Sequence, residues 1–226
     1  MQFIAGLIVA FLTVLPASAQ VAPTEAELRA YGGLHAAAAR GDFADIEKRI
    51  AAAEDKEAVD ARRRTPLHVA VYQKQRDAAR ALLRLGADPN RLEIDRYDII
   101  TIAAVANDVP MLKIALEGGG NPEAVTSIYD GTALIAAAHL GHAEVVRTLI
   151  AGGAPLDHVN NLGWTALIES IVLGNGGKNH TDTLEALVKA GANVNLADRE
   201  GNTPLRLARL RGYTEMVKIL EAAGAK

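Results

Sequence analysis

A six-residue pattern recurs along the chain at a nearly constant interval. Its clearest copy, Thr-Pro-Leu-His-Val-Ala, begins at Thr65, and a proline follows the threonine there and in the last copy, at Pro66 and Pro204. The third position of the pattern is matched at Leu34, Leu67, Ile100, Leu134, Leu167 and Leu205. The successive intervals are 33, 33, 34, 33 and 38 residues. A period of this length predicts small units that stack side by side, since one such unit cannot bury its own apolar face.

Two further motifs keep the same phase. A Gly-Ala-Asp-x-Asn type of segment closes the units, as at residues 86–90 and 191–195. Nine residues after the start of the pattern stands a residue that tolerates a positive φ angle: Gly41, Asn107, Gly141, Gly174 and Gly212. A tight turn between two helices requires such a residue. Lys74 occupies this place in the second unit, where we expect mild backbone strain.

The fourth unit shows what each repeat is expected to form. Thr132 caps a short helix that runs to about Leu140, and Gly141 turns the chain. A second helix spans residues 143–151, and the chain returns through an extended finger at about 156–164. The apolar side chains of that helix recur at helical spacing: Val145, Val146, Leu149 and Ile150. Each unit is therefore expected to share its core with its neighbours.

These motifs together resemble the ankyrin repeat, and the resemblance covers residues 30–226. It implies an all-α solenoid of about six helix-turn-helix repeats with β-hairpin-like fingers. The expected repeats are 30–61, 62–94, 95–128, 129–161, 162–199 and 200–226. The fifth repeat is longer than the others, and we expect its extra residues, about 175–180, to form a flexible projecting loop between the two helices.

The first residues read as a targeting signal. Residues 2–15 are apolar and uncharged, and they are shorter than the roughly 20 residues that span a bilayer. Pro16 and the small residues 17–19 follow, which predicts a signal peptide at 1–19 cleaved after Ala19 and a leader at 20–29. An uncleaved anchor and a buried helix are the alternatives. We therefore expect a periplasmic or secreted protein of bacterial type, with no membrane association after cleavage.

Composition and motifs argue against several classes of function. The net charge is −3 with acids and bases intermixed, so a general nucleic-acid binder is not expected. The chain has no cysteine, which excludes disulfides and cysteine-based zinc sites. No nucleophile elbow, phosphate-binding glycine loop or zinc-protease motif appears. His139 and His142 straddle the Gly141 turn and so lack the helical spacing of a metal pair. We expect no enzyme activity, no cofactor and no metal.

The resemblance implies a concave binding surface made of finger tips and first helices. Four of the aromatic residues fall there, and aromatics and arginines are enriched at binding hot spots. The candidate partner-binding residues are Arg62, Arg64, Tyr72, Tyr97, Tyr129, His139, Leu140, Leu162, Trp164, Leu173, Arg199 and Arg211. The alternative is that the rings cover the edges of neighbouring repeats. The resemblance also implies that His35 and His68 hydrogen-bond to neighbouring loops.

The predicted function is a protein–protein interaction module, a monomer in the periplasm that binds one protein partner. Two related functions remain open at this stage. One is an inhibitor or stabiliser of an exported enzyme, and the other is a secreted effector that acts on host proteins.

Overall fold

The computed structural model describes residues 20–226, and the predicted signal peptide at 1–19 lies outside the described part. A short helix, α1 (Glu25–Ala30), precedes six helix pairs, which we number as units 1 to 6. The first helices of the pairs are α2 (Gly33–Arg40), α4 (Pro66–Tyr72), α6 (Ile99–Val105), α8 (Ala133–Leu140), α10 (Ala166–Val172) and α12 (Pro204–Leu210). The second helices are α3 (Phe43–Ala51), α5 (Arg76–Arg84), α7 (Val109–Glu117), α9 (Ala143–Ala151), α11 (Lys178–Lys189) and α13 (Thr214–Ala222).

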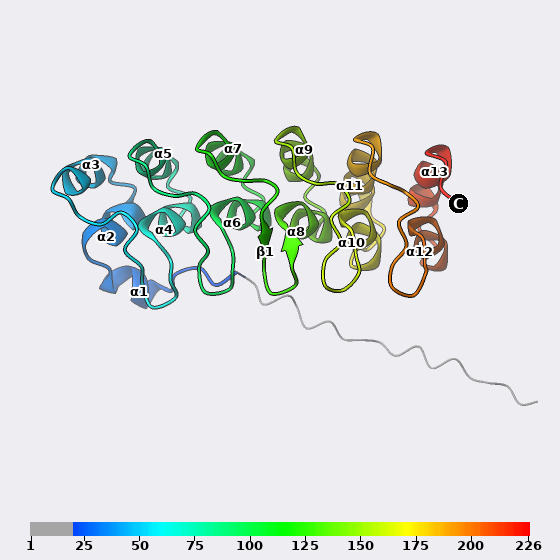
Figure 1. Ribbon diagram of the computed structural model, residues 1–226, viewed down its shortest axis with the longest axis horizontal. Coiled ribbons are helices and arrows are strands. Elements are labelled where there is room, and N and C mark those ends of the chain that lie inside the picture. The colour runs from blue at the N-terminus through cyan, green and yellow to red at the C-terminus, as the bar shows by residue number, and fades with distance from the viewer. Residues whose placement is uncertain (1–19) are drawn as a thin grey trace, which may run out of the picture.

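The units stack side by side into an elongated solenoid (Figure 1). The first helices form one row, which we call inner, and the second helices form an outer row above it. Loops that join an outer helix to the next inner helix project below the inner row, and we call these loops fingers. Among residues 20–226 one finger contains a β ladder, where β1 (Val125–Thr126) pairs antiparallel with β2 (Gly131–Thr132). The expected helical solenoid is confirmed.

Local chemistry starts the inner helices where the pattern predicts. A threonine side chain accepts the backbone N–H of the residue three positions on at Thr65, Thr132, Thr165 and Thr203. Asp98 does the same for α6, the unit in which the pattern is degenerate. Each cap satisfies one of the N–H groups that the first turn of a helix leaves unpaired. The prolines at 66 and 204 take the first helical position, where a missing N–H costs nothing.

In five of the six units the turn between paired helices has a positive φ angle at the predicted position. Gly41, Gly141 and Gly212 adopt φ values of 73°, 69° and 69°. Lys74 and Asn107 adopt 56° and 52°, so the predicted positive φ at a lysine is confirmed. A side chain at such an angle is strained by contact between Cβ and the backbone, and this cost falls on the lysine of unit 2.

The fifth unit departs from two expectations. Gly174 does not take the positive φ; Gly176 does, at 70°, because the extra residues displace the turn. The predicted flexible loop at 175–180 is also wrong, because α11 begins at Lys178 and absorbs part of the insertion as an additional helical turn. Contacts with both neighbouring units hold this segment. His180 Nε2 lies 2.9 Å from the carbonyl oxygen of His139, and the Tyr213 hydroxyl donates to the carbonyl of Gly174 at 2.9 Å.

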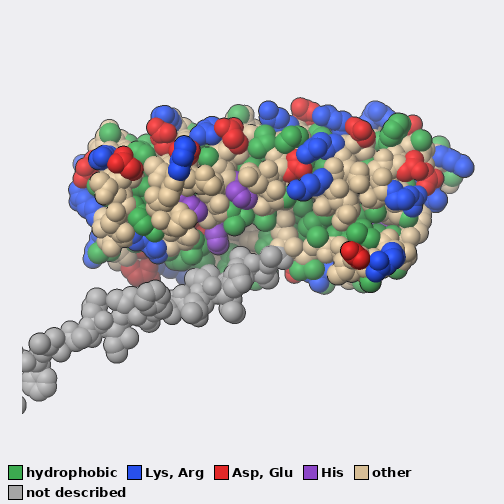
Figure 2. All heavy atoms as spheres, turned by 180° about the vertical axis from the view of Figure 1, so that it is seen from behind, with side chains coloured by type: hydrophobic (Ala, Val, Ile, Leu, Met, Phe, Trp, Pro, Cys, Tyr) green, Lys and Arg blue, Asp and Glu red, His purple; other side chains and the backbone are tan. Residues whose placement is uncertain are grey.

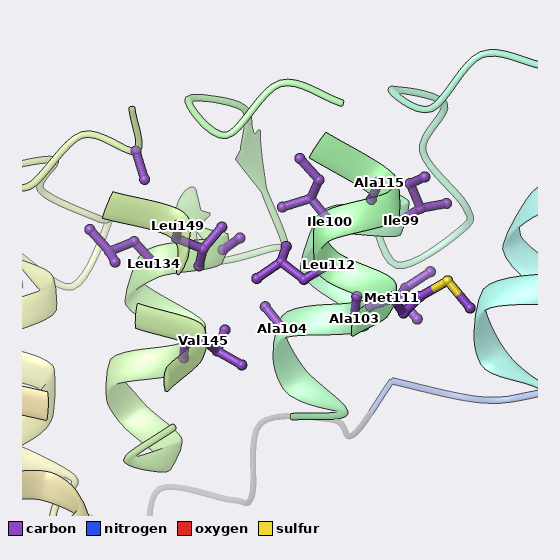
Figure 3. Close-up of a cluster of buried hydrophobic side chains, with 14 of the residues drawn as sticks. Ile99, Ile100, Ala103, Ala104, Met111, Leu112, Ala115, Leu134, Val145 and Leu149 are labelled. Carbon is purple, nitrogen blue, oxygen red and sulfur yellow. The ribbon is translucent and has the colours of Figure 1, made fainter. Parts of the chain in front are cut away.

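The hydrophobic core runs continuously between the two rows of helices. Figure 3 shows its centre, where Leu112 of α7 lies among side chains of α6, α8 and α9. Leu112, Leu134 and Leu149 have no exposed surface. Ala103 and Ala104 are buried as well, and such small side chains let adjacent helices approach closely. The core of each unit is thus completed by the next unit along the stack.

Histidines link the inner helices to the fingers. His35 Nε2 lies 2.9 Å from the carbonyl oxygen of Arg64, and His68 Nε2 lies 3.0 Å from that of Arg91. The expected structural role of both histidines is confirmed. His68 Nδ1 also accepts the backbone N–H of Thr65 at 3.2 Å. With a donor at Nδ1 and a carbonyl acceptor at Nε2, the ring is assigned as neutral with its proton on Nε2.

The fingers are rigid because they bond both to themselves and to one another. Asp60, Glu93, Asn160 and Asp198 each accept two backbone N–H groups of their own finger tip. Backbone hydrogen bonds then join adjacent fingers. They run from Ile94 N to Arg62 O at 2.9 Å, from Ser127 N to Arg96 O at 3.0 Å and from Asn161 N to Tyr129 O at 2.9 Å.

Candidate functional site

A groove of about 330 Å³ lies between the fingers and the inner helices of units 3, 4 and 5. Its apolar lining includes Val105, Ile135, Leu140, Leu162 and Leu173, with the rings of Tyr97 and Tyr129. The groove is centred on unit 4, where Gly131 and Ala136 line it. Because these two residues are small, they leave space that larger side chains would fill. We call this space the central groove.

A carboxylate is buried in the lining of the central groove. Glu169 of α10 is 3% exposed, and its Oε1 atom accepts the side-chain amide of Asn160 at 2.9 Å. Its Oε2 atom has no hydrogen-bond partner among residues 20–226. His139 Nδ1 lies 3.4 Å from Oε2, too far for a good hydrogen bond. Asn160, His139 and Glu169 all line the groove, so its apolar walls surround one incompletely paired acid.

Exposed apolar side chains also lie on the fingers of the units that form the groove. Ile94, Val125, Ile128 and Val159 are between 41% and 55% exposed, and each belongs to a finger of unit 3, 4 or 5. Leu140 and Leu162 continue this surface at the groove itself, at 41% and 38%. A cluster of this kind marks an interaction site on many proteins. Sequence reasoning missed the four finger residues, although apolar side chains within otherwise polar loops were a visible signal.

The structure brings half of the predicted binding residues together. Those that line the central groove are Tyr97, Tyr129, His139, Leu140, Leu162 and Leu173. Tyr97 is only 8% exposed, so it forms a wall of the groove and offers little free surface.

Five predicted residues lie outside the central groove. Arg62 pairs with Asp95 of the next finger at 2.5 Å. Tyr72 packs against the core, and burial raises the pKa of its hydroxyl. Trp164 is half-buried, and Arg199 and Arg211 are exposed toward the C-terminal end of the stack.

The structure corrects the prediction that Arg64 binds a partner. It was expected to face a partner, but its side chain is fully buried. Nε donates to Asp60 at 2.7 Å, Nη2 to Glu27 at 2.5 Å and Nη1 to the carbonyl of Val21 at 3.1 Å. Burial alone would raise the pKa of Asp60, but hydrogen bonds from the Tyr31 hydroxyl and from Arg64 hold that pKa below its usual value. Arg64 is therefore the anchor of the leader rather than a binding residue.

The leader reaches the edge of the central groove. Gln20 lines the groove, and its side-chain amide donates to the carbonyl of Thr101 at 2.9 Å. Val21 and Glu27 are held by Arg64, so the leader is fixed at Thr101 of α6 and at Arg64 of the finger of unit 2. Figure 1 shows this segment passing below the inner row toward unit 3.

On the face shown in Figure 2, charged side chains of one sign do not gather in one place. Basic and acidic side chains alternate there along the outer helices. Within residues 20–226, no group of three His, Cys, Asp or Glu side chains is placed to hold a metal ion. The helices in the same range are all too short or too polar to cross a membrane.

Comparison with known proteins defines the class. Residues 15–93 and 100–195 match a family model for ankyrin repeats in three copies, and residues 170–221 match one for ankyrin repeats in many copies. The chain belongs to the ankyrin repeat family. Its fold is a non-enzymatic scaffold for interactions, and the protein is a protein–protein interaction module.

Bacterial relatives are similar over nearly the whole described chain. The ankyrin repeat protein YahD of Escherichia coli (strain K12) is 33% identical over 190 residues, which are 84% of this chain and 94% of YahD. The crystal structure of an ankyrin repeat domain from Acinetobacter baumannii AYE is 44% identical, with a TM-score of 0.81, and covers 85% of this chain and 98% of that one.

More distant structures share the fold. The ankyrin repeat domain of Bcl-3 is 26% identical, with a TM-score of 0.79, over 87% of each chain. A chain in the complex of the endopeptidase Bd0816 of Bdellovibrio bacteriovorus with the immunity protein Bd3460 is 22% identical. Its TM-score is 0.70, with 85% of this chain and 98% of that chain covered, and this likeness shows the fold alone.

Proposed function

We propose that this protein is exported from a bacterial cell and, as a monomer, binds one protein partner through the central groove and the fingers beside it. The observation that carries the proposal is the exposed apolar surface of units 3 to 5, where Leu140 and Leu162 stand beside the apolar fingers. These two leucines are already more than half-buried, so completing their burial stabilises a complex by about 1 kcal/mol each, roughly half the value for a fully exposed side chain.

Rigidity supports the same surface as the binding site. The fingers of units 3, 4 and 5 are joined by backbone hydrogen bonds, at Ser127 to Arg96 and at Asn161 to Tyr129. Because these fingers are already ordered, they lose little conformational entropy when a partner docks on them. Flexible loops lose more, and this loss reduces their affinity. The aromatic walls at Tyr97 and Tyr129 add the type of side chain that dominates binding energy.

Binding is tested by capture of a partner with matched variants. Leu140→Gln/Leu162→Gln removes two exposed leucines of the groove, whereas Leu210→Gln removes a leucine of α12 that is 72% exposed and outside the groove lining. We expect the wild type and Leu210→Gln to retain the same protein from the periplasmic fraction and the double variant to lose it. Retention by all three, with folding verified by circular dichroism, would show that another surface binds.

Export rests on the sequence of the first residues. The apolar segment 2–15 and the small residues at 17–19 are typical of a cleaved signal. We expect the protein recovered from the periplasm to begin at Gln20. Mass spectrometry of the intact protein and N-terminal sequencing decide this, and a chain that keeps residues 1–19 would contradict the cleavage. Light scattering of the same sample checks for the mass of a single chain.

A second function is inhibition or stabilisation of an exported enzyme. The fold occurs in a complex of a bacterial endopeptidase with its immunity protein, which favours this possibility. It predicts that the captured partner is an enzyme whose activity or half-life changes on addition of the wild type. The double leucine variant is expected to leave the enzyme unchanged, and an equal effect of both proteins would argue against it.

A further inference from the structure

We infer that the central groove accepts a lysine or arginine side chain of the protein partner, with Glu169 as its counter-ion. This inference rests on the proposed function and adds the chemistry of the residue that the groove selects. It is carried by a buried carboxylate in an apolar groove.

The carboxylate of Glu169 is incompletely satisfied. Its side chain is 5% exposed, and Oε1 is bound by Asn160, but Oε2 has no hydrogen-bond partner among the described residues. A buried acceptor without a partner has lost its hydration without compensation, and the loss is larger for an ionised group. A donor with a positive charge supplies both the missing hydrogen bond and the opposite charge.

No lysine or arginine of residues 20–226 forms an ion pair with Glu169. Arg96 and Arg62, on the fingers of units 3 and 2, pair instead with Asp130 and Asp95. The basic side chain beside Glu169 is that of His139. Its Nδ1 lies 3.4 Å from Oε2, and the side chain is 30% exposed. Because the imidazole is not fully buried, a change of its rotamer would turn it aside and open Oε2 to the groove.

The rest of the groove fits the stem of a basic side chain. Leucines at 140, 162 and 173 and the rings of Tyr97 and Tyr129 line the same space as the carboxylate. Lysine and arginine have an apolar stem and a charged end, so the stem contacts these walls while the charge reaches the acid. Aromatic faces add attraction for a cation. The volume of about 330 Å³ lies at the small end of ligand pockets, which suits one side chain rather than a folded element.

An anionic or purely apolar occupant fits less well. A carboxylate or phosphate would meet the charge of Glu169 across apolar walls, where repulsion is weakly screened. An aliphatic side chain would fill the groove but leave Oε2 without a partner. The combination of walls and acid therefore selects a basic residue.

Three capped amino acids test the inference as probes: the N-acetyl, N-methylamide forms of arginine, lysine and norleucine. Norleucine has the stem of lysine without its charge. We titrate each into the ¹⁵N-labelled protein and follow the backbone amide shifts by NMR. The two cationic probes are expected to shift amides of units 3 to 5 and to bind at least about tenfold more tightly than norleucine.

Variants separate the charge from the shape of the groove. Glu169→Gln keeps the oxygen that accepts from Asn160 and removes the charge, so we expect the cationic probes to bind it as weakly as norleucine. Glu144→Gln, on α9 and outside the groove lining, is the matched control and should bind like the wild type. His139→Ala removes the ring beside Oε2 and should bind the cationic probes at least as tightly as the wild type.

Four results would overturn the inference. These are equal binding of norleucine, unchanged binding by Glu169→Gln, shifts outside units 3 to 5, or no saturable shift with either cationic probe. The partner capture described above is a separate readout. If Leu140→Gln/Leu162→Gln loses the partner while Glu169→Gln retains it, the groove binds a protein but does not select a basic residue.

Discussion

Acidification is expected to destabilise the stack through one buried histidine. Burial lowers the pKa of His68 from 6.5 to about 4. In the unfolded chain the ring regains an ordinary pKa near 6.5. The unfolded state thus binds a proton at a higher pH than the folded state does, and the free energy of unfolding falls as the pH drops from about 6.5 to about 4.

The size of the effect follows from the difference between the two pKa values. A difference of about 2.5 pKa units corresponds to about 3 kcal/mol, since each unit is worth about 1.4 kcal/mol. Most of this loss is complete by pH 4. The geometry agrees with a lowered pKa of His68, because Nδ1 accepts the backbone N–H of Thr65. Protonation of Nδ1 would place two N–H donors face to face.

The assay compares urea denaturation of the wild type and His68→Gln at several pH values between 7.5 and 4, a range that spans both pKa values. Glutamine keeps an N–H donor for the carbonyl of Arg91 but does not titrate. Other groups contribute to both proteins, including Glu93 and Asp98, whose pKa values burial raises. The difference between the two curves therefore isolates the histidine.

We expect the wild type to lose about 3 kcal/mol more than His68→Gln over this range. An NMR titration of the His68 ring in the folded protein should have its midpoint near pH 4. Parallel stability curves, or a midpoint near 6.5, would refute the reasoning that the ring is held neutral by burial.

Four substitutions test the packing of the stack by chemical denaturation. Arg64→Ala removes the fully buried guanidinium that pairs with Asp60 and Glu27 and should cost about 3–5 kcal/mol, whereas a loss below about 1 kcal/mol would show that these pairs are dispensable. Gly176→Ala should cost more than Gly119→Ala. Both have positive φ, but the added Cβ at 176 would lie 2.4 Å from Tyr213, while the space at 119 is open. Equal losses would refute the clash. Leu112→Ala should cost about 2–5 kcal/mol by leaving a cavity, and a neutral result would show that the core collapses around it.

Features that repeat along the sequence could be predicted. The caps at Thr65 and Thr132 and the turns at Gly41 and Gly141 depend on residues a few positions apart, so their chemistry is visible in each copy. The role of His68 followed from the resemblance to the ankyrin repeat.

Features that depend on a single tertiary contact could not be predicted. Arg64 resembles a loop arginine until Glu27, 37 residues away, is placed beside it. Glu169 occupies a helix position that looks solvated in the sequence, and its burial depends on Asn160 of the finger and His139 of the preceding unit. The insertion in unit 5 was misread because its glycines favour a loop, whereas contacts with His139 and Tyr213 hold it in place.

The position of the central groove also has a kinetic consequence. In a linear array each unit is held by its immediate neighbours, so opening begins at the termini, where a unit has one neighbour instead of two. The groove belongs to units 3, 4 and 5, with α2 to α5 on one side and α12 and α13 on the other. Fraying of the last unit therefore leaves the binding surface assembled. Amide hydrogens of α8 should exchange more slowly than those of α13, and the lifetime of a bound partner should not depend on the faster opening of the last unit.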